Sequence, residues 1–442
     1  MDADHRSGLR RQHRRRRRLA GQPCGTHRMA AADGRPNTGQ EMELIGQTTE
    51  SLATHRQRLG PLPTLPSGDL IAELESSGLL GRGGAGFPVG RKWRTVAERS
   101  SGRAVVLANG AEGEPLSRKD RSLMAARPHL VIDGALLAAG AVGANDIIFY
   151  IGTEHRAAEA AMRHALAERA ADIRGRAQIV TAPTGYVSGE ESAAVHYVND
   201  GDARPTTTPP RPFDRGVGGR PTLVQNVESL ALAALIARRG RDWYVDQGRR
   251  GGIGLITVSG AVTHAGVQEI ALGSTLSDLA AGAGGLRGDA QAVLLGGYFG
   301  GWAEVDEQWG LPLEPRSMRA RGLALGCGVV HFLPADSCGV EATSRIMAYL
   351  ASQSARQCGP CVFGLSAIAE AMQRLATRSA HANDLDRVVR WSGQLAGRGA
   401  CHHPDGAVGL IGSSLQLFAD DFAAHQRRRC LTVSRPERVA VA

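Results

Sequence analysis

The sequence predicts an α/β fold in three parts: an α/β domain at residues 42–250, a small β-rich domain at 251–334 and a helical bundle at 335–430. Three observations favour this division. The chain has 442 residues, 42% of them hydrophobic, enough for two to four units of roughly 100–200 residues each. In the first part, short β-rich runs alternate with Ala/Leu-rich helical runs. The last part has long segments of helical period without strands.

The first domain is predicted to hold a parallel sheet, because its strands alternate with helices. The expected strands are 104–108, 146–151 and 178–181, and the expected helices are 128–141, 154–171 and 226–238. A loop rich in Pro, Thr and Gly at 203–221 precedes the last of these helices.

The second and third parts differ from the first in texture. Expected strands at 254–260, 267–270 and 292–295, with a helix at 276–282 capped by Ser274 or Thr275, fit a small β-grasp-like module. The bundle is expected to consist of helices 341–353, 362–375, 385–396 and 413–427.

The net charge of +9 is concentrated at one end of the chain. Ten arginines against three aspartates in residues 1–40 account for +7 of it. Residues 1–41 are therefore expected to be a disordered basic arm, and 431–442 a short tail. Met29 and Met42 are alternative starts, and a start at either would leave all or most of the arm untranslated. Because it lacks interleaved aromatic residues, no nucleic-acid partner is expected.

Lysine is nearly absent. Of the 52 basic side chains, only Lys92 and Lys119 are lysines. In a chain with such a strong arginine bias, a remaining lysine marks a position where arginine is unsuitable. Both lysines lie in one glycine-rich stretch, which directs attention to its loops.

Seven cysteines are too few for a disulfide scaffold in a chain of this length. The close pair Cys358 and Cys361 instead indicates metal ligands or a redox centre. The longest apolar runs are interrupted or too short to span a bilayer, and no signal peptide pattern follows the arginine run. A cytoplasmic location is expected.

The string GRGGAGFPVGRKW at residues 81–93 has five glycines within 81–90 and ends beside Lys92. Such a loop lets backbone N–H groups approach phosphate oxygens, and the cation can meet the remaining charge. The alternative is a flexible linker, which Phe87, Pro88 and Trp93 make less favourable. The string matches neither a Rossmann fingerprint nor a Walker loop.

Two further strings follow predicted strands. NGAEGEPLSRKDR begins at Asn109 and carries Glu112 and Glu114; ligands of open α/β sheets bind beyond the carboxyl ends of strands. Acidic loop tips are nevertheless more often simply solvated. GYVSGEES at 185–192 places Tyr186 before Glu190 and Glu191, and a helix starting there would use these carboxylates at its N-terminus.

A fourth string, GGRPTLVQNVES at 218–229, includes Asn226, for which helix capping is again the simple explanation.

Taken together and in this order, from about residue 70 to about 423, the four strings resemble the family of NADH-binding flavoprotein subunits of NADH-quinone oxidoreductase (respiratory complex I) and its relatives in NAD-linked hydrogenases and formate dehydrogenases. The family motifs look like G-R-G-G-A-G-F-P-T-G-x-K-W, N-A-D-E-x-E-P-x-x-x-K-D-R, G-A-Y-x-C-G-E-E-T and G-x-P-T-x-x-N-N-V-E-T-L-A. Lys92 and Lys119 match their two lysines.

The resemblance implies a Rossmann-like domain for FMN and NADH, a soluble-ligand-binding β-grasp domain and a helical domain with an iron–sulfur cluster. Hydride transfer between parallel rings would need no protein acid or base. Phe87 and Phe213 would flank the adenine, and glutamates near the ribose would favour NAD(H) over NADP(H). The cofactor-binding residues implied are Gly81, Arg82, Gly83, Gly84, Gly86, Phe87, Lys92, Asn109, Glu112, Glu114, Tyr186, Gly189, Glu190, Glu191, Phe213 and Asn226.

The chain departs from the family at the flavin and at the cluster. Ala111 replaces the aspartate of N-A-D-E, Gln225 replaces the first asparagine of N-N-V-E, and the lysine of a K-P-P-F-P stretch has only Arg211 as a counterpart. The first two changes remove or alter two polar contacts at the flavin.

The family's cysteine motif aligns with Cys358, Cys361 and a distant Cys401, but its first cysteine is Ala355. Four thiolates hold an ordinary [4Fe–4S] cluster, so one iron would need another donor. The open alternatives are His402 or His403, Cys338, water, a partner chain, a three-iron cluster, or loss of the cluster. Zinc at the three thiols with His402 is a further option.

The expected function is therefore that of an NADH-oxidising flavoprotein that passes electrons through FMN to an iron–sulfur or quinone-linked partner. The resemblance implies a thioredoxin-like [2Fe–2S] subunit or a ferredoxin as that partner, and membrane contact only through partners. The altered cluster motif favours a stand-alone reductase over a full complex I. The alternative is a non-catalytic scaffold or ligand-binding relative.

Overall fold

The first sheet is built around two apolar runs, residues 104–110 and 144–152, that are buried almost throughout, as expected for strands of a parallel sheet covered on both faces. The computed structural model describes residues 43–246 and 252–432, so the predicted basic arm at 1–41 lies outside the described residues, as does most of the predicted tail. The four strands are β1 (Ala104–Gly110), β2 (Ala144–Gly152), β3 (Ala177–Ala182) and β4 (Thr222–Asn226).

All pairings in this sheet are parallel, in the order β3-β2-β1-β4. From β1 the chain adds β2 and then β3 on one side of β1, and it later adds β4 on the other side of β1. This is the strand order of one half of a Rossmann fold. The α/β prediction is confirmed. Strand β4 was not predicted, because its five residues TLVQN run directly into the next helix.

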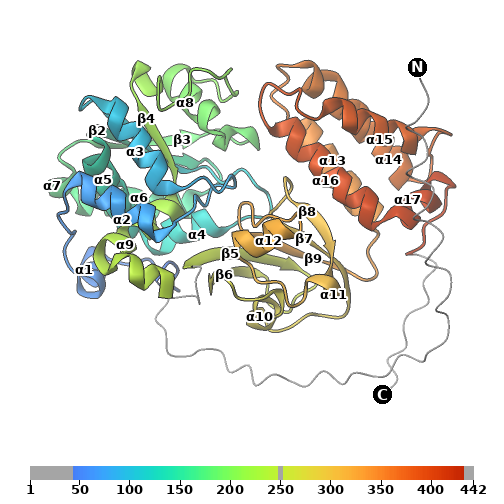
Figure 1. Cartoon of the computed structure of the whole chain (residues 1–442), viewed down its shortest axis with the longest axis horizontal. Helices are drawn as coiled ribbons and strands as arrows, with labels where there is room; N and C mark the ends of the chain where they lie inside the picture. Colours follow the sequence, from blue (N-terminus) through green and yellow to red (C-terminus); the bar gives the residue numbers. More distant parts are fainter. Residues whose placement is uncertain (1–42, 247–251, 433–442) are drawn as a thin grey trace, which may run out of the picture. The chain divides into compact units, whose positions relative to one another are not determined.

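Helices surround this sheet (Figure 1). They are α1 (Leu52–Leu59), α2 (Ser67–Ser77), α3 (Val89–Ser100), α4 (Lys119–Ala126), α5 (Pro128–Val142), α6 (Arg156–Glu168), α7 (Ala170–Ile173), α8 (Glu191–Asp200) and α9 (Val227–Asp246), the last broken at Gly240. Helices α5 and α9 pack tightly at Gly134, where an added Cβ would lie 2.1 Å from the carbonyl oxygen of Leu230. Only glycine permits that approach.

A buried ionic group ties α5 to its neighbours. The carboxylate of Asp133 accepts hydrogen bonds from His55 Nε2 at 2.8 Å and from Arg169 and Arg238. On the other side of His55, Nδ1 lies 3.2 Å from Glu50. Burial would raise the pKa values of these carboxyls, but the hydrogen bonds and positive charges around them prevail, and both pKa values fall to about 2.

Stability is therefore expected to fall in acid through this group. A carboxyl such as Asp133, whose pKa drops from 3.8 to about 2 on folding, stabilises the native state by roughly 2 kcal/mol at neutral pH. That contribution is complete above the unfolded-state pKa and is lost as pH falls from about 4 toward 2. Urea unfolding at stepped pH measures it. In an Asp133→Asn variant the acid slope should be shallower, and an unchanged slope would contradict the assignment.

The second sheet has five strands in the order β6-β5-β9-β7-β8. Its first strand, β5, pairs antiparallel with β6 and parallel with the last strand, β9, which is the central arrangement of a β-grasp. The strands are β5 (Ile253–Gly260), β6 (Gly266–Ala271), β7 (Ala290–Leu295), β8 (Gly301–Glu304) and β9 (Val329–Pro334); the helices are α10 (Leu276–Gly282), α11 (Val305–Gln308) and α12 (Pro315–Ala320).

The prediction for this module was partly wrong. The segment 292–295 is not its final strand, since β8 and β9 follow it; β8 is short, and β9 carries the polar His331 amid apolar residues. The predicted helix at 276–282 is confirmed. Of the two candidate caps, Thr275 fills the role, in a capping box with Asp278.

The last part is helical, as predicted. Its helices are α13 (Gly339–Ser352), α14 (Ser366–Ala376), α15 (Asp384–Leu395), α16 (His403–Leu417) and α17 (Ala419–Gln426), with a π-helical turn at Pro360–Leu365 before α14. The predicted helix 413–427 was wrong: α16 starts ten residues earlier, and the helical path breaks at Phe418. Glycines at 406, 409 and 412 lower helix propensity and concealed the true start. Within the described residues, no helix is long and apolar enough to cross a membrane.

Candidate functional site

The candidate site lies where the strand order of the first sheet reverses. Asn109 near the end of β1 pairs in register with Asn226 at the end of β4. Strands β1 and β4 are neighbours in the order β3-β2-β1-β4. Open α/β sheets bind ligands in a crevice beyond the carboxyl ends of such strands, so the site is expected there. The motifs singled out in the sequence meet there.

The glycine loop closes one side of this crevice. Its ends are fastened by a bridge between Leu80 and Pro88 and by a hydrogen bond from the Gly81 N–H to the Phe87 carbonyl oxygen, 2.8 Å. Gly83 approaches Asn226, since a Cβ at Gly83 would lie 3.4 Å from the Asn226 Cβ. The loop is therefore anchored at both ends and held against β4.

Within the loop, backbone donors remain available. Residues 82–85 form a turn, but among residues 43–246 and 252–432 no well-aligned backbone hydrogen bond of 3.5 Å or less uses the N–H groups of Gly83, Gly84, Ala85 or Gly86. Gly84 and Gly86 have φ values of +111° and +62°, which disfavour any side chain. The loop leads into α3, whose first turn has no side-chain cap. These donors and the helix N-terminus form a cradle suited to a phosphate.

Lys92 lies in the first turn of α3 beside this cradle. Its Nζ is 2.9 Å from the carboxylate of Glu191, and both side chains are partly exposed. Arg211 lies 3.9 Å from the same carboxylate. The structure thus brings together Lys92 from the first string, Glu191 from the third, and the arginine that stands near the expected family lysine.

Arg82 serves a different purpose from its neighbours in the loop. Its backbone N–H donates to Ser229 Oγ at 2.9 Å, and its guanidinium lies buried, 3.0 Å from Glu228. The side chain consequently anchors the loop to α9 and does not face the cradle.

Lys119 belongs to the same buried group. Its Nζ is 2.9 Å from Glu228 and 2.7 Å from Asp120, and its side chain is only 2% exposed. Asp120 in turn accepts a hydrogen bond from the Asn226 amide at 2.7 Å. Neighbouring carboxylates keep the pKa of Lys119 above its usual range despite burial. The lysine that the composition singled out therefore supports the crevice floor and touches no solvent; sequence reasoning missed its partners Asp120 and Glu228.

Asn109 and Glu112, the first two site residues expected in the second string, form hydrogen bonds with backbone groups. The Asn109 amide donates to the Gly189 carbonyl at 2.8 Å and accepts from the Ala111 N–H, so it links β1 to the turn before α8. Glu112, at φ +45°, accepts from the backbone N–H groups of Asp120 and Arg121 and so caps α4.

Glu190 has the capping role that the sequence suggested. Its carboxylate accepts hydrogen bonds from the backbone N–H groups of Ser192 and Ala193, at 2.9 and 3.0 Å, at the start of α8. Of the two adjacent glutamates, Glu191 is therefore the one directed to Lys92.

Glu114 and Tyr186 meet in a buried contact. Glu114 accepts a hydrogen bond from the Tyr186 hydroxyl at 3.0 Å and another from the Tyr298 backbone N–H at 2.8 Å. Burial raises the pKa of Glu114. The ring of Tyr186 packs edge-on against Phe299 and His403, with centroids 4.7 and 5.7 Å away. Phe299 was missed in the sequence because it comes from the β-grasp part, far along the chain.

The two phenylalanines expected to flank an adenine are separated. Phe87 is 48% exposed and lies near Arg91, whereas Phe213 is partly buried under the guanidinium of Arg99. Eight residues of α3 separate these arginines, roughly 12 Å along the axis. Phe87 alone presents its ring to solvent next to the cradle.

One buried polar atom at the crevice has no partner in the described part of the chain. Gln225, 4% exposed near the end of β4, leaves its Oε1 without a hydrogen bond. A buried unpaired acceptor costs about 1–3 kcal/mol unless something satisfies it. Together with the unpaired loop donors, it fits a bound group that carries a phosphate at one end and hydrogen-bond donors at the other, as FMN does.

Three cysteines of the helical part lie together. The thiols of Cys358 and Cys361 are near enough to affect each other's pKa, and Cys401 interacts electrostatically with both. Burial alone would raise the pKa of Cys358, but the backbone N–H groups of Ala400 and Cys361 lower it below its usual value. Burial raises the pKa of Cys361 to about 12. N–H donors directed at sulfur are typical of iron–sulfur sites, so these thiols fit a cluster.

The proposed substitutes for the missing cysteine differ in their surroundings. His402 beside Cys401 is almost fully exposed, 3.5 Å from Asp405. His403 is buried and its Nε2 bonds the Leu350 carbonyl oxygen at 2.8 Å. Cys338 lies instead with His425, 3.3 Å from Nε2. His402 is thus the accessible histidine, and Cys338 belongs to a different group of side chains.

Two parts of the chain match known protein families. Residues 74–234 match the family described as the Nuo51 FMN-binding domain, and residues 341–425 match the NADH-ubiquinone oxidoreductase-F iron-sulfur binding region. The F subunit of NADH-quinone oxidoreductase from Mycobacterium tuberculosis (strain ATCC 25618 / H37Rv) is 32% identical over 387 residues, covering 84% of this chain and 87% of the relative. Its counterpart in Streptomyces coelicolor (strain ATCC BAA-471 / A3(2) / M145) is 31% identical over 371 residues, which cover 81% of this chain and 83% of the relative.

A solved structure also matches: an NAD+-reducing [NiFe]-hydrogenase in the air-oxidized state, with a TM-score of 0.75 and 29% sequence identity. The alignment covers 82% of this chain and 63% of the hydrogenase chain, so the present chain spans less than two thirds of that chain's length.

Proposed function

The chain belongs to the family of NADH-quinone oxidoreductase F subunits, and on that premise we propose that the crevice between β1 and β4 binds FMN and NADH. It is an NADH-oxidising FMN flavoprotein subunit of the complex I type, which passes electrons to iron–sulfur centres. The observations that best support the location are the N–H donors of Gly83, Gly84 and Gly86, which have no partner in the described part of the chain, and the buried Gln225 oxygen, which also has none.

The residues at the crevice bind and orient. The N–H groups of Gly83, Gly84 and Gly86 would hold the FMN phosphate, with Lys92 supplying positive charge. Asn226 and Gln225 would face the flavin from β4. Held by these residues, FMN would supply a hydride acceptor for NADH and a carrier that can release electrons one at a time. No acid or base is required of the protein, which fixes the two rings and excludes water.

We assign the dinucleotide to the side of the loop where Phe87 and Glu191 lie. The exposed ring of Phe87 can stack on a base, and the carboxylate of Glu191 disfavours a 2′-phosphate by repulsion, so NADH is expected over NADPH. Tyr186, Gly189, Glu114 and Glu190 then shape the wall of this space. Phe213, with its ring under Arg99, is assigned a packing role.

The iron–sulfur centre that we propose has three cysteine ligands, Cys358, Cys361 and Cys401. Since Ala355 offers no thiolate, a [4Fe–4S] cluster held there would need another donor for one iron, and we assign this role to the exposed His402, which is next to Cys401 in the sequence.

A Cys358→Ala variant should lose most of its iron and acid-labile sulfide, because two thiolates cannot retain the cluster. Iron and sulfide analysis of anaerobically purified chain measures this. Cys327→Ser is the matched control: its thiol is hydrogen-bonded to the Gly296 carbonyl within the β-grasp part. Equal iron in wild type and Cys358→Ala would defeat the ligand assignment.

A turnover assay distinguishes an enzyme from a non-catalytic scaffold. The scaffold is the alternative that Ala111 and Ala355 favour. The FMN-loaded chain should reduce ferricyanide, a one-electron acceptor, at the expense of NADH. A chain that binds FMN yet shows no NADH-dependent reduction would support the scaffold.

Partner subunits with iron–sulfur centres follow from the assemblies of this family. We propose that the direct acceptor is a thioredoxin-like [2Fe–2S] subunit or a ferredoxin. We further propose a cytoplasmic protein that reaches the inner face of the membrane only through such partners. The altered cluster supports a stand-alone reductase.

A further inference from the structure

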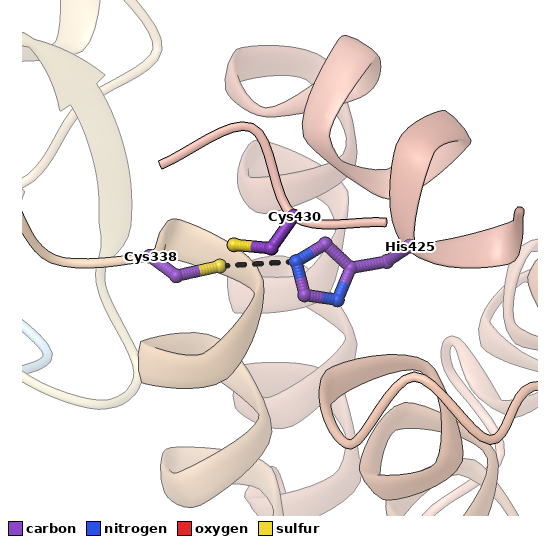
Figure 2. Close-up of side chains that lie close together, drawn as sticks. All are labelled: Cys338, His425 and Cys430. Carbon is purple, nitrogen blue, oxygen red and sulfur yellow. Dashed lines mark hydrogen bonds between the residues drawn. The ribbon is translucent and has the colours of Figure 1, made fainter. Parts of the chain in front are cut away.

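A second group of metal-ligating side chains lies at the far end of the helical part. Cys338, His425 and Cys430 each offer a ligand atom, and these atoms all lie within 4.8 Å of one another. Figure 2 shows the three side chains converging from the start of α13, the end of α17 and the segment after it. All three are buried, with exposed fractions of 7%, 0% and 5%.

The histidine is oriented as a metal ligand. His425 Nδ1 lies 2.9 Å from the Leu375 carbonyl oxygen, which can only accept, so Nδ1 carries the proton. Nε2 therefore presents its lone pair, and it faces Cys338 Sγ at 3.3 Å. A hydrogen bond from the remote ring nitrogen to a carbonyl is the usual support of a metal-bound histidine.

We propose that Cys338, His425 and Cys430 bind a zinc ion, distinct from the iron–sulfur centre. Two thiolates with one imidazole suit zinc, and hard cations such as Mg²⁺ or Ca²⁺ are disfavoured. Zinc displaces the two thiol protons on binding, and its fourth position is left to water or another donor. Because Cys338 is committed here, it does not serve as the missing cluster ligand.

The position suggests what the zinc does. Cys338 lies between β9 and α13 and directly precedes that helix. His425, 87 residues later, lies in the last turn of α17, and Cys430 follows that helix. A metal joining these points fixes the two ends of the helical part to each other. It also orders the chain beyond α17, because Cys430 lies four residues past the end of that helix.

Metal analysis of the full-length chain, grown with zinc and iron and purified anaerobically, tests the proposal. Wild type should contain about one zinc per chain, as expected for a single structural site. Cys430→Ser and His425→Ala should lose the zinc and keep the iron. Cys358→Ala should do the reverse, and Cys327→Ser should keep both.

Cobalt substitution guards against variants that fail to fold. The Cys358→Ala chain, whose iron is expected to be lost, should take up Co²⁺ and show thiolate-to-cobalt charge transfer, which zinc then abolishes. Cys430→His in that background should still bind cobalt with a weaker thiolate band. A wild-type chain without zinc and a Cys358→Ala chain without a thiolate–cobalt band would overturn the proposal, as would equal zinc in wild type, Cys430→Ser and His425→Ala.

Discussion

Replacing Lys119 with methionine is expected to lower the free energy of unfolding by about 3–5 kcal/mol, the usual effect of breaking a buried ion pair from one side. Methionine fills similar volume but removes the Lys119 ion pairs with Asp120 and Glu228, and Arg82 then remains as the cation 3.0 Å from Glu228. Both carboxylates are buried, so water cannot replace the lost charge.

Urea unfolding followed by intrinsic fluorescence measures this change. Arg94→Met is the matched control, because Arg94 pairs with Glu75 at the surface, with 43% of its side chain exposed. An exposed pair contributes little, so this variant should unfold near the wild-type midpoint. If Lys119→Met were as stable as Arg94→Met, the buried group would not be the support of the crevice described above.

The second large effect is expected from Gly84→Ala, on FMN binding. Gly84 has φ +111°, which an L-residue reaches only with strain of about 1–3 kcal/mol. The loop will relax away from this backbone, and the N–H groups of Gly83, Gly84 and Gly86 will no longer converge. The dissociation constant for FMN should therefore rise at least about tenfold, which corresponds to 1.4 kcal/mol.

Fluorescence titration of apoprotein with FMN measures the affinity. Gly68→Ala is the control, because a Cβ at Gly68, as at Gly84, would meet no protein atom within 4 Å, but its φ is not in the left-handed region. Wild-type affinity in Gly84→Ala would place the phosphate elsewhere.

Local patterns predicted the elements that depend on local physics. The buried strands β1 and β2, the Thr275 cap and the capping role of Glu190 all follow from a few adjacent residues. Strand β4 and the start of α16 were missed because a short strand merging into a helix, or a helix containing three glycines, gives little local signal.

The partners of the site residues could not be predicted, because they depend on distant contacts. Lysine scarcity singled out Lys119, but nothing in the sequence indicated that it would be buried against Glu228, more than a hundred residues away. The same holds for Phe299 beside Tyr186 and for the group of Cys338, His425 and Cys430. Residue scarcity and motif order directed attention to the strings that meet at the ends of β1 and β4, while the contacts that support these residues required the fold.

The most direct test of the central claim is the visible spectrum of the FMN-reconstituted chain under anaerobic conditions, before and after NADH is added. If the crevice between β1 and β4 holds flavin and nicotinamide together, flavin absorbance will remain with the protein after desalting and will bleach on addition of NADH. A colourless protein after desalting, or bound flavin whose absorbance NADH leaves unchanged, would contradict it.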